Sequence, residues 1–175
     1  MELKHPKEFY KNYQADNIID AIDIELIKCI EEFIPTSVFE FGCGSGKNLA
    51  LLKKNSSYIE TYGMDISIVN VMQAHLNGVD CVIRGDERYM PNSKFDVCFT
   101  CSVLDHIPHE NIEQVIGNLV SMSRKAVVIA ETNEYEGEFY YRHDFESFGF
   151  VKQTLAFESE GDGLNYFIWV KLCVE

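Results

Sequence analysis

Apolar residues recur along the chain with two different periods. Ile19, Ile22, Leu26 and Ile30 keep helical spacing, which predicts an amphipathic helix that Pro35 ends. Beyond it, short apolar runs alternate with amphipathic segments, a pattern typical of an α/β fold with a parallel sheet. The pattern predicts strands at residues 37–41, 58–64, 81–84, 95–101 and 125–130, and helices at 47–54, 67–76, from 108 past 120, and at 143–148.

The last two apolar runs, at residues 150–157 and 164–174, are separated only by the short sequence SEGDG. This link is too short for a crossover, so the two strands must pair as an antiparallel hairpin. The sequence therefore predicts a seven-stranded, doubly wound, mostly parallel α/β sheet whose first five strands are joined by helices and whose C-terminal strands form a hairpin. Its 175 residues fit one domain of ordinary size.

The net charge of the chain argues against one class of binding partner, the nucleic acids. The chain has 15 Lys and Arg against 28 Asp and Glu, a formal net charge of −13, which repels a phosphate backbone. We therefore expect no nucleic-acid partner. The acidity is either a solvated surface or selection for a cationic or neutral small substrate. The N-terminus has no apolar signal core, and no run approaches the roughly 18 apolar residues of a membrane span, so we expect a cytoplasmic protein without a membrane partner.

The six cysteines lie in apolar runs and are expected to be reduced core residues. Cys98 and Cys101 form one C-x-x-C pair. Residues three apart on a strand point to opposite faces of the sheet, so we expect neither a disulfide nor a metal site there.

A glycine-rich turn follows the first predicted strand. The sequence VFEFGCGSGKN places Gly42, Gly44 and Gly46 directly after a run that contains Glu40. Glycines let backbone N–H groups approach a ligand closely just before a helix begins. Asp65 ends the second strand, where a ribose-binding carboxylate lies in dinucleotide folds. The two features together predict a nucleotide-type cofactor site.

The spacing of the glycines separates the possible cofactors. A nicotinamide or flavin fingerprint requires G-x-G-x-x-G, and a P-loop requires glycine at Phe41 and Ser or Thr at Asn48, so both fail. The string E-x-G-x-G-x-G after a first strand resembles motif I of the class I S-adenosylmethionine-dependent methyltransferases. The resemblance covers nearly the whole chain, including the closing hairpin. It implies a single methyltransferase domain, with an N-terminal lid and helix at residues 1–35 and a Rossmann-like core at 36–175.

The resemblance also implies roles for individual residues. Glu40 would hold the ammonium group of the cofactor, Asp65 the ribose hydroxyls and Asp86 the adenine amine. The alternatives are a structural hydrogen bond for Glu40, helix capping for Asp65 and turn chemistry for Asp86. Tyr10 and Tyr13 either belong to the lid or pack on the core helix. The implied cofactor-binding residues are Glu40, Gly42, Cys43, Gly44, Gly46, Asn48, Asp65, Ile66, Asp86, Cys101, Ser102, Val103 and Tyr13.

Asp105 and His106 fall where many members of the family have Glu-His. An imidazole, with an ordinary pKa of about 6.5, can take the proton from an incoming nucleophile, so His106 with Asp105 forms the candidate catalytic pair. Simple packing of His106 under the cofactor is the alternative. Asp105, Glu131 and Asn133 would give an incomplete set of magnesium ligands, and we expect no metal.

These residues predict methyl transfer from S-adenosylmethionine to a small-molecule acceptor through an oxygen or nitrogen nucleophile, with a sugar or another polar metabolite as the acceptor. Two other classes remain open. One is a cofactor-binding partner subunit without catalysis, and the other is an NAD-type oxidoreductase.

Overall fold

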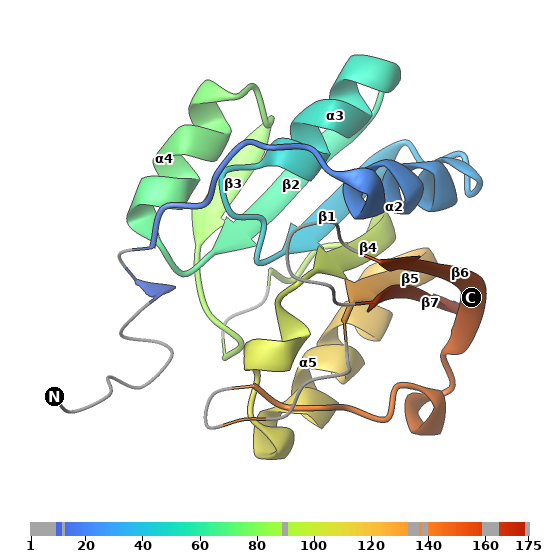
Figure 1. The fold of residues 1–175 in the computed structure, drawn as a ribbon. Coiled ribbons are helices and arrows are strands. Elements are labelled where there is room, and N and C mark those ends of the chain that lie inside the picture. The colour runs from blue at the N-terminus through green and yellow to red at the C-terminus, as the bar shows by residue number, and fades with distance from the viewer. Residues whose placement is uncertain are drawn as a thin grey trace, which may run out of the picture.

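A computed structural model describes residues 10–11, 13–88, 91–132, 137, 140–158 and 165–173. Its helices and strands alternate along most of the chain (Figure 1). The elements are α2 (Ala21–Glu31), β1 (Ser37–Phe41), α3 (Lys47–Asn55), β2 (Glu60–Asp65), α4 (Ile68–Leu76), β3 (Cys81–Arg84), β4 (Phe95–Cys101), the 3-10 turn η1 (Leu104–His106), α5 (His109–Met122), β5 (Ser123–Glu131), the 3-10 turn η2 (Glu146–Phe148), β6 (Val151–Glu158) and β7 (Asn165–Leu172).

The strands form one seven-stranded sheet with the order β3-β2-β1-β4-β5-β7-β6. Strands β1 to β5 pair in parallel, whereas β7 runs antiparallel to both β5 and β6. This topology confirms the predicted doubly wound sheet with a closing hairpin. The SEGDG link of that hairpin lies outside the described residues.

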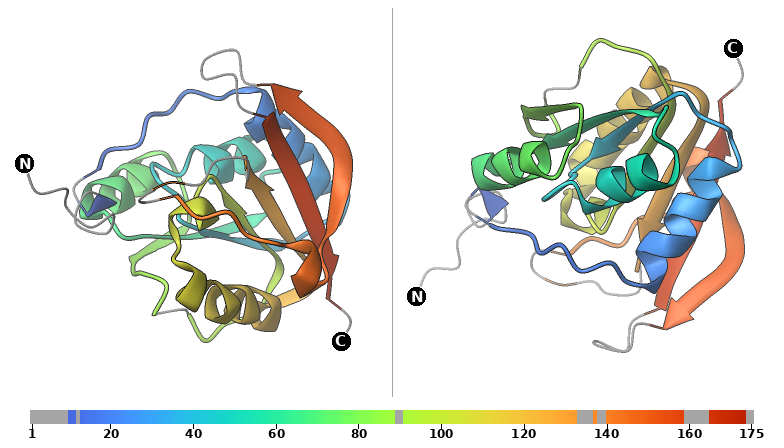
Figure 2. Two further views of the ribbon diagram at one scale, coloured as in Figure 1. Left: turned by 60° about the horizontal axis from the view of Figure 1, so that its bottom comes forward. Right: turned by 90° about the horizontal axis from the view of Figure 1, so that it is seen from above.

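Helices cover both faces of the sheet, with α2, α3 and α4 on one side and α5 on the other (Figure 2). Successive residues of a strand therefore enter different cores, as the period of two requires. In β1, Val38 packs with the α2 and α3 residues, while Phe39 packs with α5. Burial on both faces explains why the central strands are apolar almost without interruption.

The fold differs from the prediction in two connections. Residues 85–88 and 91–94, between β3 and β4, are irregular, so the prediction that helices join all of the first five strands is wrong there. This stretch contains Gly85-Asp86 and Pro91-Asn92, which favour turns over helix. The helix predicted at residues 143–148 is only the turn η2, and Gly149 ends it with a φ of 81°. The other elements differ from the prediction mainly at their ends.

The connections leave β1 and β4 in opposite directions across the sheet. From β1 the chain moves outward to β2 and β3, whereas from β4 it moves to β5. Ligands of open α/β sheets bind at such a reversal, beyond the carboxyl ends of the strands. None of the helices among the described residues is long and apolar enough to cross a membrane.

Candidate active site

A cavity of about 600 Å³ opens beyond the carboxyl ends of β1, β2 and β4. It brings together most of the residues that the sequence predicts for the site. Gly46 and Asp105 do not line it. The predicted residues on its wall are Tyr13, Glu40, Gly42, Cys43, Gly44, Asn48, Asp65, Ile66, Asp86, Cys101, Ser102, Val103 and His106.

The glycine turn is held close to neighbouring strand ends. The backbone N–H of Gly42 donates to the carbonyl of Met64 at 2.8 Å, and Gly42 has a φ of 71°. A Cβ at Gly42 would lie 2.5 Å from Cγ2 of Val103, so a side chain there would push apart the loops after β1 and β4. Gly46 is the N-cap of α3 with a φ of 77°, which explains its role without contact to the cavity.

Glu40 is buried in β1 at the wall of the cavity. One carboxylate oxygen, Oε1, accepts from Nδ2 of Asn48 at 2.9 Å. The other, Oε2, is buried without a hydrogen-bond partner among the described residues. Burial raises the pKa of Glu40 well above its ordinary value, and the Asn48 bond opposes this only in part. An orphaned carboxylate oxygen on a residue that lines a cavity fits a cationic donor such as an ammonium group.

Asp65 accepts hydrogen bonds from the glycine turn and from the start of α4. Its Oδ2 accepts from the N–H of Gly44 at 2.9 Å, and its Oδ1 accepts from the N–H of Ser67 at 2.8 Å and from Nδ2 of Asn70 at 3.2 Å. Burial raises the pKa of Asp65 and these hydrogen bonds offset part of the rise. Asp65 therefore has a structural role at the start of α4, where Ser67 is the N-cap, and also lines the cavity.

Asp86 makes contacts within a turn and also lines the cavity. It accepts from the N–H of Arg88 at 3.1 Å, the predicted turn chemistry, and it pairs with the Arg88 guanidinium. It also lines the cavity beyond the end of β3.

Residues 13–20, which we name the strap, run past α4 and the start of α3 to α2 (Figures 1 and 2). Hydrogen bonds attach the strap to the site: Ala15 N–H donates to Oδ1 of Asn70 at 2.9 Å, and Oγ of Ser45 donates to the carbonyl of Asp16 at 2.7 Å. Tyr13, Ala15 and Asp16 also line the cavity, so the strap forms part of its wall.

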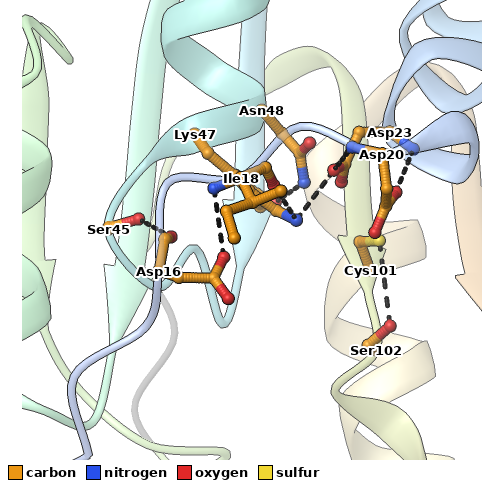
Figure 3. A network of polar contacts seen from close by, with 10 residues as sticks. Asp16, Ile18, Asp20, Asp23, Ser45, Lys47, Asn48, Cys101 and Ser102 are labelled. Atoms are coloured by element: carbon orange, nitrogen blue, oxygen red, sulfur yellow. Dashed lines mark hydrogen bonds and ion pairs between the residues drawn. The ribbon is translucent and has the colours of Figure 1, made fainter. Parts of the chain in front are cut away.

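Lys47 joins the strap to α2 (Figure 3). Its Nζ donates to the carbonyl of Ile18 at 3.1 Å and lies 2.7 Å from Oδ2 of Asp23, a carboxylate with no exposed surface. Burial raises the pKa of Asp23, and Lys47 opposes this shift. Burial alone would lower the pKa of Lys47, but its hydrogen bond and charge interaction with Asp23 outweigh burial and raise it.

The loop after β4 is shaped by a carboxylate from β5. Oε1 of Glu131 accepts from the N–H groups of Val103 and Leu104, each at 2.8 Å. These bonds hold the turn η1 that carries His106. Ser102, just before it, has a φ of 53°, a strained conformation for a residue with a side chain. Burial, and next the charge of Asp105, raise the pKa of Glu131.

His106 lies at the cavity wall between two tyrosines. Its Nε2 lies 2.8 Å from the hydroxyl of Tyr10 and 3.5 Å from Oδ1 of Asp105. The ring centroids of His106 and Tyr140 are 4.9 Å apart. His106 and Asp105 are thus adjacent as predicted, although only His106 reaches the cavity.

Metal binding finds no support in the described part of the chain, where no three His, Cys, Asp or Glu residues are grouped to hold an ion. Asn133, one of the possible magnesium ligands, lies outside the described residues. Glu131 instead holds backbone N–H groups. Cys98 and Cys101 enter different cores and are free thiols, as predicted.

Several residues of the site escape sequence reasoning. Asn70 lies five positions after Asp65, and its amide next to an acidic strand end is the one local signal that could have identified it. Contacts such as those of Asp16, Lys47 and Tyr166 depend on elements far apart in the chain.

Comparisons with known proteins agree with the fold. A family model described as a methyltransferase domain matches residues 38–126, slightly more than half of the chain. No curated protein sequence matches this chain. The magnesium protoporphyrin IX methyltransferase of Synechocystis PCC 6803, solved with S-adenosylhomocysteine, is similar over 90% of this chain and 90% of its own, with a TM-score of 0.67 and 17% identity.

A second structure is the 1,6-didemethyltoxoflavin-N1-methyltransferase of Burkholderia thailandensis, solved with its named substrate and S-adenosylhomocysteine. It is similar over 89% of this chain and 79% of its own, with a TM-score of 0.69 and 14% identity. A plantazolicin methyltransferase gives a TM-score of 0.67 at 11% identity, over 89% of this chain and 86% of its own. At these identities the likeness shows a shared fold.

Proposed function

The chain belongs to the methyltransferase domain family, and we propose that it transfers a methyl group from S-adenosylmethionine to a small molecule. The observation that carries this proposal is the orphaned Oε2 of Glu40, buried beside the glycine turn at the wall of the cavity. The bound forms of the similar structures, which contain S-adenosylmethionine or S-adenosylhomocysteine, support the same cofactor.

The residues present fit this cofactor. Glu40 would receive its ammonium group, and Asp65 would accept from the ribose hydroxyls with the lone pairs that its three protein donors leave. Asp86, which also lines the cavity, would accept from the adenine amine. The sulfonium supplies an activated methyl carbon. The protein itself must hold the nucleophile in line with that carbon, and such alignment alone can contribute several kcal/mol.

We propose an acceptor that reacts through oxygen or nitrogen, such as a sugar or another polar metabolite. The net charge of −13 disfavours a nucleic acid, and the named substrates of the similar structures include a porphyrin and a toxoflavin precursor. His106, next to the partly buried carboxylate of Asp105, is the candidate base for a protonated nucleophile.

Two measurements test the proposal. Calorimetric titration should show binding of S-adenosylhomocysteine and none of NAD. Incubation with methyl-labelled S-adenosylmethionine and a small-molecule cell extract should then transfer label to a small product. Binding without any transfer, across extracts that support a known methyltransferase run in parallel, would favour a non-catalytic partner subunit. Absence of binding would contradict the cofactor assignment itself.

A further inference from the structure

Tyr10 contacts the nitrogen of His106 that would otherwise act as the base. Tyr10 and His106 both line the cavity, and the Tyr10 hydroxyl lies 2.8 Å from Nε2 of His106. Asp105 Oδ1 approaches the same nitrogen at 3.5 Å. The Tyr10 ring also contacts Tyr13, with centroids 5.5 Å apart, so the pair is built into the start of the strap. A nitrogen that already has these two neighbours is poorly placed to meet an acceptor directly.

The surroundings of Tyr10 keep its hydroxyl protonated. Burial raises the pKa of Tyr10 above its ordinary value of about 10, and the nearby Tyr140, Asp105 and Tyr13 add to the rise. The hydroxyl therefore keeps its proton and can donate it to Nε2 of His106 when the ring proton of the histidine is on Nδ1.

Asp105 completes the arrangement. Its Oδ1 is buried without a hydrogen-bond partner among the described residues. Once Nε2 gains a proton, the imidazolium and this carboxylate become an ion pair in a shielded position, which stabilises the charged histidine. Glu131 fixes the turn that carries both side chains through the N–H groups of Val103 and Leu104.

We propose that Tyr10 is a catalytic residue that relays the proton of the acceptor to His106, an inference that rests on the proposed methyl transfer. The oxygen of Tyr10 takes the proton from the O–H or N–H of the acceptor while its own proton passes to Nε2 of His106. The freed lone pair of the acceptor bonds to the methyl carbon as the carbon–sulfur bond breaks, and sulfur becomes a neutral thioether. His106 afterwards releases the proton to water.

This relay narrows the substrate class. It serves an acceptor whose reacting atom carries a proton near neutral pH, namely a hydroxyl or an N–H group. A carboxylate has no proton to give and needs no relay. Because Tyr10 lies ahead of the strap in the chain, the relay is complete only when this N-terminal segment is in place.

The change Tyr10→Phe tests the relay while retaining the ring contacts. In protein labelled with 15N-histidine, the wild-type spectrum should show His106 at neutral pH with the proton on Nδ1 and an unprotonated Nε2. Tyr10→Phe should shift the ring towards the tautomer with a protonated Nε2, because Asp105 can then accept a hydrogen bond from Nε2–H. Tyr141→Phe is the matched control, because its ring contacts His109 and not His106, and it should leave the His106 signals unchanged. A wild-type Nε2–H tautomer, or a spectrum unaffected by Tyr10→Phe, would overturn the proposal.

Function is tested in parallel with the same variant. Tyr10→Phe should bind S-adenosylhomocysteine within about threefold of wild type, yet transfer label from S-adenosylmethionine to the extract acceptor roughly 10- to 100-fold more slowly. An unchanged transfer rate would refute the relay. If the wild-type protein fails to bind S-adenosylhomocysteine, the methyl-transfer proposal fails, whereas the tautomer result decides the Tyr10–His106 arrangement separately.

Discussion

Buried carboxylates line the cavity, and burial makes their negative charge unfavourable when no cationic ligand is bound. Glu40 is the case at the cavity wall, where its Oε2 has no partner among the described residues and burial raises its pKa. We predict that Glu40→Gln increases the free energy of unfolding of the cofactor-free protein at pH 8 by about 1 kcal/mol or more, because an amide removes a buried charge. The same variant should bind S-adenosylhomocysteine about 10- to 100-fold more weakly. Urea denaturation and calorimetry measure the two effects.

Glu131→Gln provides the control for this prediction. Glu131 is equally buried with a raised pKa, but it does not line the cavity. Because the amide oxygen of Gln can still accept from the N–H groups of Val103 and Leu104, the variant should keep the loop and the affinity for S-adenosylhomocysteine. Equal loss of affinity in both variants would show that Glu40 acts through the fold rather than through the ligand.

Asp65 is predicted to matter for both ligand and loop. Asp65→Asn should weaken binding of S-adenosylhomocysteine by about 1 to 3 kcal/mol, because a charged acceptor for the ribose is removed. Some stability should be lost as well, since the side chain holds Gly44, Ser67 and Asn70. Asp80→Asn is the matched control: Asp80 also accepts from a backbone N–H, that of Thr61, but away from the cavity. Calorimetry showing unchanged affinity for Asp65→Asn would exclude the ribose role.

At the scale of elements, an ion pair between Lys47 and the buried Asp23 joins α2 and α3. Lys47→Met should destabilise the protein by about 2 to 3 kcal/mol, because it leaves Asp23 buried and unpaired. Adding Asp23→Asn should recover part of the loss. Lys53→Met, on the same helix, breaks a more exposed pair with Asp80 and should change stability by only about 0.5 kcal/mol. Equal effects of the two lysine variants in urea denaturation would contradict this ranking.

The elements show what a sequence can reveal. Strands such as β4 and β5 are apolar on both faces, and the glycine turn has a fixed spacing, so period and composition were enough to predict them. The prediction for the link between β3 and β4 was wrong because it extended the alternation of strands and helices across turn-forming residues. Lys47 with Asp23, Glu131 with η1, and Tyr10 with His106 join residues that are far apart in the chain, and no local pattern indicates such contacts.

For the whole molecule, buried acids predict an unusual dependence of stability on pH. Burial raises the pKa of Asp23, Glu40, Asp65, Asp105 and Glu131 in the folded protein. Above the unfolded values of about 4, the folded state therefore binds more protons than the unfolded state, and stability falls as pH rises. The lowered pKa values of Asp80 and Asp96 act in the opposite direction, below about pH 4.

We expect the cofactor-free protein to unfold at higher urea concentration at pH 5.5 than at pH 8. The difference should persist in 1 M NaCl, which screens the repulsion of surface charges from a net charge of −13 but not the burial of carboxylates. Saturating S-adenosylhomocysteine should reduce it, because the ligand ammonium compensates Glu40. Higher stability at pH 8 would contradict the assignment of these acids as charged and buried.

The strap has a kinetic consequence. It forms part of the cavity wall through Tyr13, Ala15 and Asp16, and a few hydrogen bonds attach it to the loops beneath. If spent cofactor leaves past this segment, some of these hydrogen bonds must break first. We therefore expect the first turnover to be faster than those that follow, with the residence time of the product, rather than the chemical step, limiting the enzyme at steady state.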